Sequence, residues 1–179
     1  MILGMSTATY TLLHVLISLV GIGSGLVVMY GLLTANPLRR WTQLFLVTTA
    51  ATSLTGFLFP NAHVTPGIVI GVLSLILLVA AVVARYRVHL RGAARPIYVF
   101  STSIALYFNV FVLVVQSFEK VPALKALAPT QKEPPFVVAQ LIVLAFFVAL
   151  TVLGLKRFHP GSAGGTGSAL SPQDRKRAA

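Results

Sequence analysis

The sequence predicts an all-α integral membrane protein, a polytopic bundle of five transmembrane helices with its N-terminus outside and its C-terminus in the cytoplasm. Three observations lead to this fold class. Of the 179 residues, 56% are hydrophobic and only 9% are charged, whereas soluble domains carry about 25% charged residues. The apolar residues form five runs of roughly 20 residues, the length that crosses a bilayer. The basic residues gather in alternate loops, as the positive-inside rule requires.

Prolines bound the predicted spans, because proline is tolerated at the start of a helix and resists its continuation. Pro66, Pro96 and Pro135 begin the third, fourth and fifth spans, and Pro60 follows the second. The predicted spans cover residues 10–33, 41–59, 66–84, 96–116 and 135–155. Together with their connecting loops, they predict one transmembrane domain over residues 1–158.

The charges of the loops set the predicted orientation. The first loop carries Arg39 and Arg40, and the third carries the arginines from Arg85 to Arg95, while the second has no acidic residue, lysine or arginine. Basic loops stay in the cytoplasm, so the flexible basic tail over residues 159–179 is expected there as well. This topology is typical of a multi-pass protein of the bacterial inner (plasma) membrane.

The loop between the fourth and fifth spans, residues 117–134, is predicted to lie on the outer surface. Val121, Leu124 and Leu127 recur at three-residue spacing, which predicts a short amphipathic turn at the membrane interface. Two interpretations stay open: an interfacial connector, or a cap over a cavity or partner-docking surface.

The first span contains a glycine-rich string from Gly21 to Gly25. It lacks the third glycine of the dinucleotide fingerprint and the lysine of a Walker loop, and it lies near the middle of a span. Gly21 and Gly25 instead have the small-x-x-x-small spacing that lets membrane helices approach closely. We predict a helix–helix seam at Gly21, Ser24 and Gly25, where Ser24 can bond across the contact, either within one chain or between two.

Polar side chains also line two other predicted spans. The polar face consists of Thr48, Thr52, Thr55, Ser101, Asn109 and Gln116, and Thr49 and Ser53 extend it. One interpretation is a hydrogen-bonded helix contact, although hydroxyls can also bond the carbonyl four residues back. The other is a polar pathway for a small solute. The amide of Asn109 needs partners beyond its own backbone, so we expect it to face the bundle or a partner.

Two histidines are candidate ligands for a haem. His14 is the one ionisable side chain inside a predicted span, apart from tyrosine, and His63 lies in an outer loop at a similar depth. Neutral imidazole ligates haem iron well. The competing interpretation is that His14 bonds to a neighbouring hydroxyl or lies at the lipid interface. The chain has no cysteine, so a thiolate metal site and a cysteine nucleophile are excluded.

The predicted spans contain no Asp, Glu, Lys or Arg, which argues against ion-coupled transport. The basic residues lie in separate loops rather than in one stripe, which argues against nucleic-acid binding. We therefore expect a non-enzymatic accessory or scaffold subunit without a cofactor. Its partners would be membrane lipids and a second copy of the chain or a larger membrane complex. The alternatives are a channel or carrier for a small neutral solute, and a haem-binding redox subunit.

Overall fold

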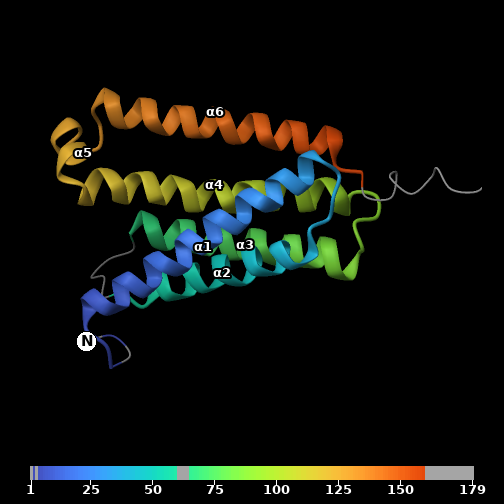
Figure 1. The fold of residues 1–179 in the computed structure, drawn as a ribbon, viewed down its shortest axis with the longest axis horizontal. Coiled ribbons are helices and arrows are strands. Elements are labelled where there is room, and N and C mark those ends of the chain that lie inside the picture. Colours follow the sequence, from blue (N-terminus) through green and yellow to red (C-terminus); the bar gives the residue numbers. More distant parts are fainter. Residues whose placement is uncertain (1, 3, 60–64, 160–179) are drawn as a thin grey trace, which may run out of the picture.

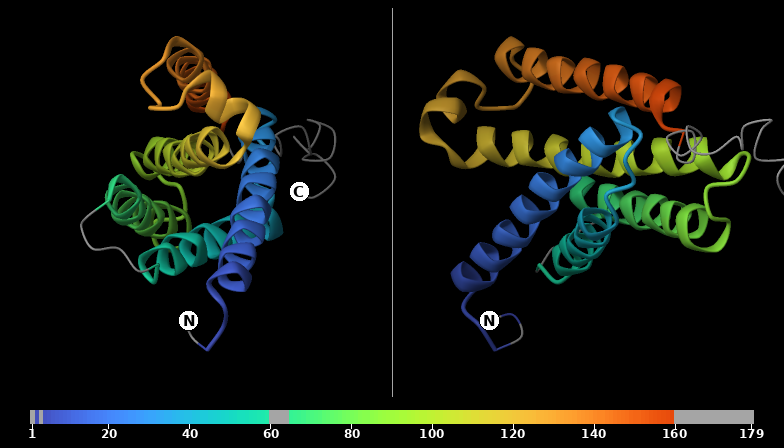
Figure 2. Two further views of the ribbon diagram at one scale, coloured as in Figure 1. Left: turned by 90° about the vertical axis from the view of Figure 1, so that its left-hand side faces the viewer. Right: turned by 45° about the vertical axis from the view of Figure 1, so that its right-hand side comes forward.

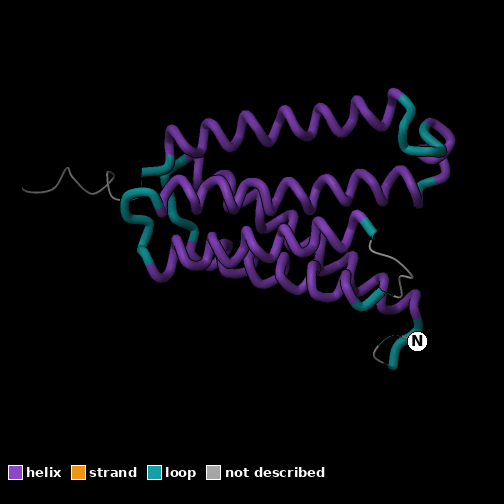
Figure 3. The backbone as a smooth tube through the Cα atoms, turned by 180° about the vertical axis from the view of Figure 1, so that it is seen from behind, coloured by secondary structure: helices purple, strands orange, loops and turns teal. Residues whose placement is uncertain are grey.

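The structure is a computed structural model that describes residues 2, 4–59 and 65–159. These residues form six α-helices and one π-helical turn, and they contain no strand. The elements are α1 (Thr7–Leu33), α2 (Arg39–Phe57), α3 (Pro66–Val82), η1 (Val83–Arg87), α4 (Ala94–Lys120), α5 (Pro122–Leu127) and α6 (Pro134–Arg157). The predicted all-helical fold is confirmed (Figure 3).

Local chemistry explains where several helices begin. The backbone N–H of Thr9 donates to the Ser6 hydroxyl at 3.1 Å, which caps α1. Prolines stand in the first turn of α3, α5 and α6, where their missing N–H costs nothing. α4 continues to Lys120, past the predicted end at Gln116, because no proline interrupts it before Pro122.

The helices lie side by side around α4. α4 contacts α1, α2, α3, α5 and α6, and α1 contacts α2 most extensively. α6 lies beside α4 on the far side from α2 and α3, and α1 crosses the bundle diagonally (Figures 1 and 2). Tyr98, Leu106 and Phe45 are fully buried where these helices meet.

α1 and α6 meet near one end of the bundle and separate toward the other (Figure 1). Gly154 of α6 lies near this meeting: a Cβ atom added there would be crowded by Val99 Cγ1 of α4 at 3.1 Å and would be in ordinary contact with Leu32 Cβ of α1 at 3.7 Å. We call the end of the bundle where α1 and α6 meet the arginine end. It comprises loop residues 34–38 and 88–93, the adjoining ends of α1, α2, η1 and α4, and the C-terminus of α6.

Four helical stretches are long and apolar enough to cross a membrane: α1, α3 together with η1, α4, and α6. The chain is therefore a helical membrane protein. α2 has 19 residues and is less apolar, because it contains several threonines and begins with Arg39 and Arg40. A fifth crossing by α2 stays a prediction. The predicted tail after His159 lies outside the described residues.

Candidate functional site

The glycine string of α1 lies at contacts within the chain. Gly21 faces α2, where an added Cβ atom would lie 3.3 Å from Thr48 Oγ1. Gly25 is more tightly enclosed, because its added Cβ atom would lie 2.5 Å from Leu106 Cδ1 and 2.9 Å from the Phe45 ring. The close approach thus joins α1 to α2 and α4 of the same chain.

Among the described residues, Ser24 makes no hydrogen bond across this seam. The Ser24 hydroxyl donates to the carbonyls of Val20 at 2.7 Å and Gly21 at 3.1 Å, both on α1 itself. A serine in a membrane helix finds this acceptor without any partner helix. Ser24 is buried in the seam, and its contribution there is its small size.

One hydrogen bond crosses the polar face. Asn109 Nδ2 donates to Thr49 Oγ1 at 3.1 Å, which joins α4 to α2. Thr48 and Thr55 instead donate to carbonyls of their own helix. The Thr52 hydroxyl is buried and has no hydrogen-bond partner among the described residues. Within the described part of the chain, the Asn109 side chain therefore bonds to Thr49 alone, and the threonines of α2 do not form a continuous row of hydrogen bonds with α4.

The predicted polar stripe of α4 does not share one environment. Ser101 is buried toward the arginine end, whereas Gln116 is exposed near α5. Between them, the Ser103 hydroxyl donates to the Val99 carbonyl at 2.8 Å and lies 3.5 Å from Met29 Sδ. Ser101 and Asn109 therefore lie at contacts between helices, whereas Gln116 lies at the surface.

His14 is fastened to α2. The Thr55 hydroxyl donates to the Ala51 carbonyl at 2.7 Å, and its Oγ1 lies 2.8 Å from His14 Nδ1 in a hydrogen bond whose donor depends on the tautomer of the imidazole. His63 lies outside the described residues, so the haem pair stays a hypothesis. The described residues contain no group of three or more candidate metal ligands.

Two aromatic side chains support this contact. The Tyr10 hydroxyl donates to the Thr55 carbonyl at 2.8 Å. The Phe59 ring lies edge-on to Tyr10, with ring centres 5.1 Å apart, and edge-on to His14 at 5.3 Å. These contacts fix the start of α1 against the end of α2.

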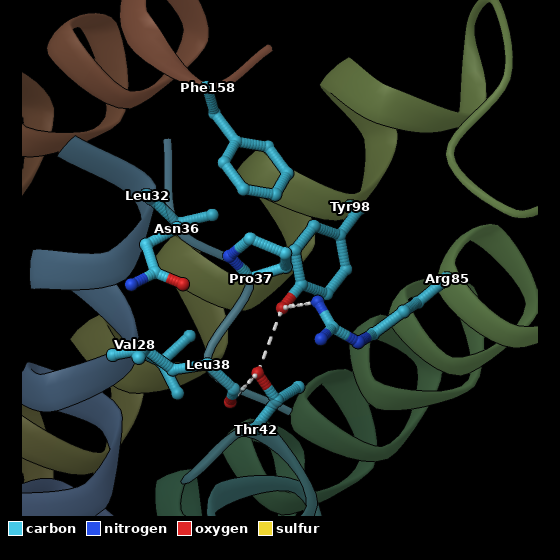
Figure 4. Close-up of a pocket in the computed structure, with 9 residues that line it drawn as sticks. All are labelled: Val28, Leu32, Asn36, Pro37, Leu38, Thr42, Arg85, Tyr98 and Phe158. Atoms are coloured by element: carbon cyan, nitrogen blue, oxygen red, sulfur yellow. Dashed lines mark hydrogen bonds between the residues drawn. The ribbon is translucent and has the colours of Figure 1, made fainter. Parts of the chain in front are cut away.

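A different cluster lies at the arginine end and centres on Tyr98 (Figure 4). Arg85 Nη1 donates to the Tyr98 hydroxyl at 3.0 Å. Thr42 Oγ1 lies 3.4 Å from that hydroxyl and donates to the Leu38 carbonyl at 3.0 Å. The guanidinium carbon of Arg85 also lies 5.2 Å from the centre of the Tyr98 ring, within cation–π range. The cluster joins the start of α2, η1 and the start of α4.

Sequence reasoning missed this cluster, because it used the arginines only to predict orientation. No spacing motif links residues 42, 85 and 98. The only available indication was that Arg85 belongs to a basic segment without a neighbouring carboxylate.

Arg95 performs a separate task at the same end. Its Nη1 donates to the carbonyls of Leu155 at 3.0 Å and Phe158 at 2.7 Å. The last carbonyls of a helix have no partner within the helix, so Arg95 caps α6 and holds its C-terminus against α4.

The loops of the arginine end contain unusual backbone. The N–H of Val88 donates to the Val83 carbonyl at 3.0 Å, which closes the π-helical turn that carries Arg85. His89 and Leu90 follow with φ of 55° and 59°. π-helical turns and left-handed non-glycine residues are uncommon and occur often at functional sites.

Two cavities differ in character. A narrow crevice beside Tyr98 has no room for the centre of a water molecule. An apolar cleft of about 340 Å³ lies between α1, α4 and α6. The apolar cleft is lined by Ile22 and Leu26 of α1, Val110 and Leu113 of α4, and four residues of α6 between Ile142 and Phe147. Neither cavity is lined by Thr48, Thr52, Thr55, Ser101 or Asn109.

Glu133 organises the loop before α6 at the opposite end. It accepts hydrogen bonds from the N–H and the hydroxyl of Thr130, at 3.2 and 2.9 Å, and from the N–H of Lys132 at 3.1 Å. Desolvation raises the pKa of Glu133. These hydrogen bonds, together with one from its own backbone, lower the pKa by more than desolvation raises it, so the pKa lies below its ordinary value of 4.5.

The chain matches no protein-family model, no curated protein and no solved structure.

Proposed function

We propose that the protein is a non-enzymatic accessory or scaffold subunit that associates through its membrane helices with a second copy of itself or with a larger complex. The proposal includes five crossings with α2 as the second, an outer N-terminus and residence in a bacterial inner membrane. Arg91 of loop 88–93 and the arginines at the neighbouring helix ends, Arg39, Arg40, Arg85, Arg87 and Arg95, support this orientation.

The apolar cleft is the observation that carries the proposal. It is a concave apolar surface on which a helix of a partner could pack. Within a membrane, helix association depends on close van der Waals contact rather than on hydrophobic attraction. Gly23 adds a second feature on the same helix, because a Cβ atom added there would meet nothing within 4 Å. The backbone of α1 is therefore open to a close approach beside Ile22 and Leu26.

Two polar contacts inside the bundle support helix association rather than chemistry. Asn109 bonds Thr49, and His14 bonds Thr55, so these groups join helices of the same chain. Short polar contacts of this kind are a usual means of holding membrane helices together.

Cysteine cross-linking tests the proposal directly, because the chain has no native cysteine. Leu26→Cys and Ile142→Cys each place one thiol at the apolar cleft. After treatment of intact membranes with a short bifunctional maleimide, both variants should yield adducts of higher mass, and mass spectrometry identifies a second copy or another protein.

Val79→Cys is the matched control, since Val79 is an equally apolar and 64% exposed residue of α3, compared with 64% for Ile142. It should yield severalfold less adduct. Equal cross-linking from all three positions, or adducts from none, would contradict association through the cleft.

A further inference from the structure

We infer that the arginine end carries a specific binding site for the phosphate of an anionic phospholipid, with Arg85 as its anchor. The inference goes beyond helix association and depends only on this end meeting a membrane surface.

The charge at this end is one-sided. Its basic residues are Arg39, Arg40, Arg85, Arg87, Arg91, Arg95, Lys156 and Arg157. Within the described residues, both carboxylates, Glu119 and Glu133, lie at the opposite end near α5, and the one ion pair there is Glu119 with Lys120. The arginine end therefore attracts anions without any internal counter-charge in the described part of the chain.

Arg85 is held in place by neutral groups. It is half-buried, it donates to the Tyr98 hydroxyl, and it lies over the rings of Tyr98 and Tyr86 at 5.2 and 5.8 Å. These contacts orient the guanidinium but leave its charge uncompensated. A guanidinium has five N–H donors in a fixed planar fork, and the contact with Tyr98 uses one nitrogen. The remaining donors suit two phosphate oxygens.

The other arginines differ from Arg85. Arg95 is committed to the carbonyls of Leu155 and Phe158. Arg87 and Arg91 are exposed, and no contact with another described residue orients their guanidinium groups. Arg85 is thus the oriented cation of the end that retains free donors.

Buried residues pack behind Arg85. The crevice beside it combines polar Asn36 and Thr42 with apolar Leu32 and Phe158. Leu32, Thr42 and Phe158 are almost completely buried and the crevice does not admit water, so these residues support Arg85 from within the bundle, and we place the phosphate on the exposed side of the guanidinium. A lipid headgroup is favoured over a free phosphate, because the flanking stretches, α3 with η1 and α4, are long and apolar enough to cross a membrane.

The test uses the full-length protein in lipid nanodiscs of phosphatidylcholine with increasing phosphatidylglycerol, and native mass spectrometry counts the retained anionic lipid. Arg85→Gln should weaken retention about tenfold. Arg85→Lys keeps the charge but not the fork, and Tyr98→Phe removes the hydroxyl that orients the guanidinium, so each should weaken it severalfold.

Arg87→Gln is the matched control, with the same charge change at an exposed arginine. It should weaken retention at most about fivefold, the general effect of one surface charge, and this effect should vanish in about 0.5 M NaCl. The Arg85→Gln effect should persist there. If Arg85→Gln does not fold, the severalfold loss of lipid retention expected for Arg85→Lys and Tyr98→Phe tests the inference in its place.

Equal losses in Arg85→Gln and Arg87→Gln that both disappear in salt would overturn the inference in favour of diffuse attraction. Displacement of the lipid by millimolar inorganic phosphate would also overturn it, since the site would then bind free phosphate. Loss of cross-linking at Leu26→Cys with unchanged lipid retention would affect only the proposed association.

Discussion

Asn109 on α4 donates a 3.1 Å hydrogen bond from Nδ2 to Oγ1 of Thr49 on α2. We expect Asn109→Leu to lower the free energy of unfolding by roughly 0.6–2 kcal/mol, the range for hydrogen bonds between membrane helices. Reversible unfolding in mixed micelles measures this change in the free energy of unfolding. Thr49→Val should have a similar effect, and the double variant should be little worse than either single one. Additive losses would show that the two side chains act independently.

Asn109→Leu also tests the alternative of a channel for a small neutral solute. If solute passes along this face, liposome flux should fall in the variant while its fold is retained. No flux in the wild-type protein, or unchanged flux in the variant, would remove the alternative.

Gly25 and Gly23 form a matched pair on α1. Gly25→Ala would place a methyl group 2.5 Å from Leu106 and 2.9 Å from Phe45, and overpacking of this kind costs about 1–3 kcal/mol. Gly23→Ala meets nothing within 4 Å and should leave the thermal midpoint in detergent nearly unchanged. Equal effects of the two substitutions would argue against the tight contact at Gly25.

Arg95→Met should loosen the C-terminus of α6, because the carbonyls of Leu155 and Phe158 would lose a charged donor. Hydrogen bonds to charged groups contribute about 1.5–3 kcal/mol, so we expect a loss of that order. Protease cleavage after Arg157 should quicken. Arg91→Met is the control, because Arg91 is exposed, and cleavage that quickens equally in both variants would contradict the cap.

The loop before α6 should be sensitive to acid. The pKa of Glu133 lies below its ordinary value of 4.5, so its carboxylate stabilises the folded loop above that pH. The stabilisation is lost as the pH falls through the lowered pKa. Unfolding in detergent between pH 6 and pH 3 (about the range where carboxylates titrate) should show this loss in the wild-type protein.

Glu133→Gln should remove most of that dependence, whereas Glu119→Gln, at an exposed pair with Lys120, should retain it. A wild-type midpoint that does not fall in acid more steeply than that of Glu133→Gln would contradict a role for these hydrogen bonds.

The helices could be predicted from the sequence, because long apolar runs and prolines such as Pro66 and Pro134 act locally. The crossing by α2 is harder to establish, since its threonines lower its hydropathy while serving contacts with neighbouring helices. Composition alone does not distinguish a polar residue that faces a helix from one that faces water.

The site was less predictable, because it depends on tertiary contacts. Spacing singled out Gly21 and Gly25, but only the structure identifies their neighbours. Ser24 has two available acceptors, and the sequence does not choose between its own helix and another. In the sequence Arg85 indicates orientation alone, because its partner Tyr98 belongs to a different helix.

The π-helical turn at residues 83–87 makes the backbone of the arginine end sensitive to chain length, in addition to the dependence on the Arg85 side chain. The turn accommodates one more residue than an α-helical turn between Val83 and Val88. Deleting a single residue here would restore regular helix and rotate the downstream segment by about 100°. Arg85 would leave Tyr98, and the His89–Leu90 bend would change direction. In this segment, insertions and deletions should therefore be tolerated far less than substitutions.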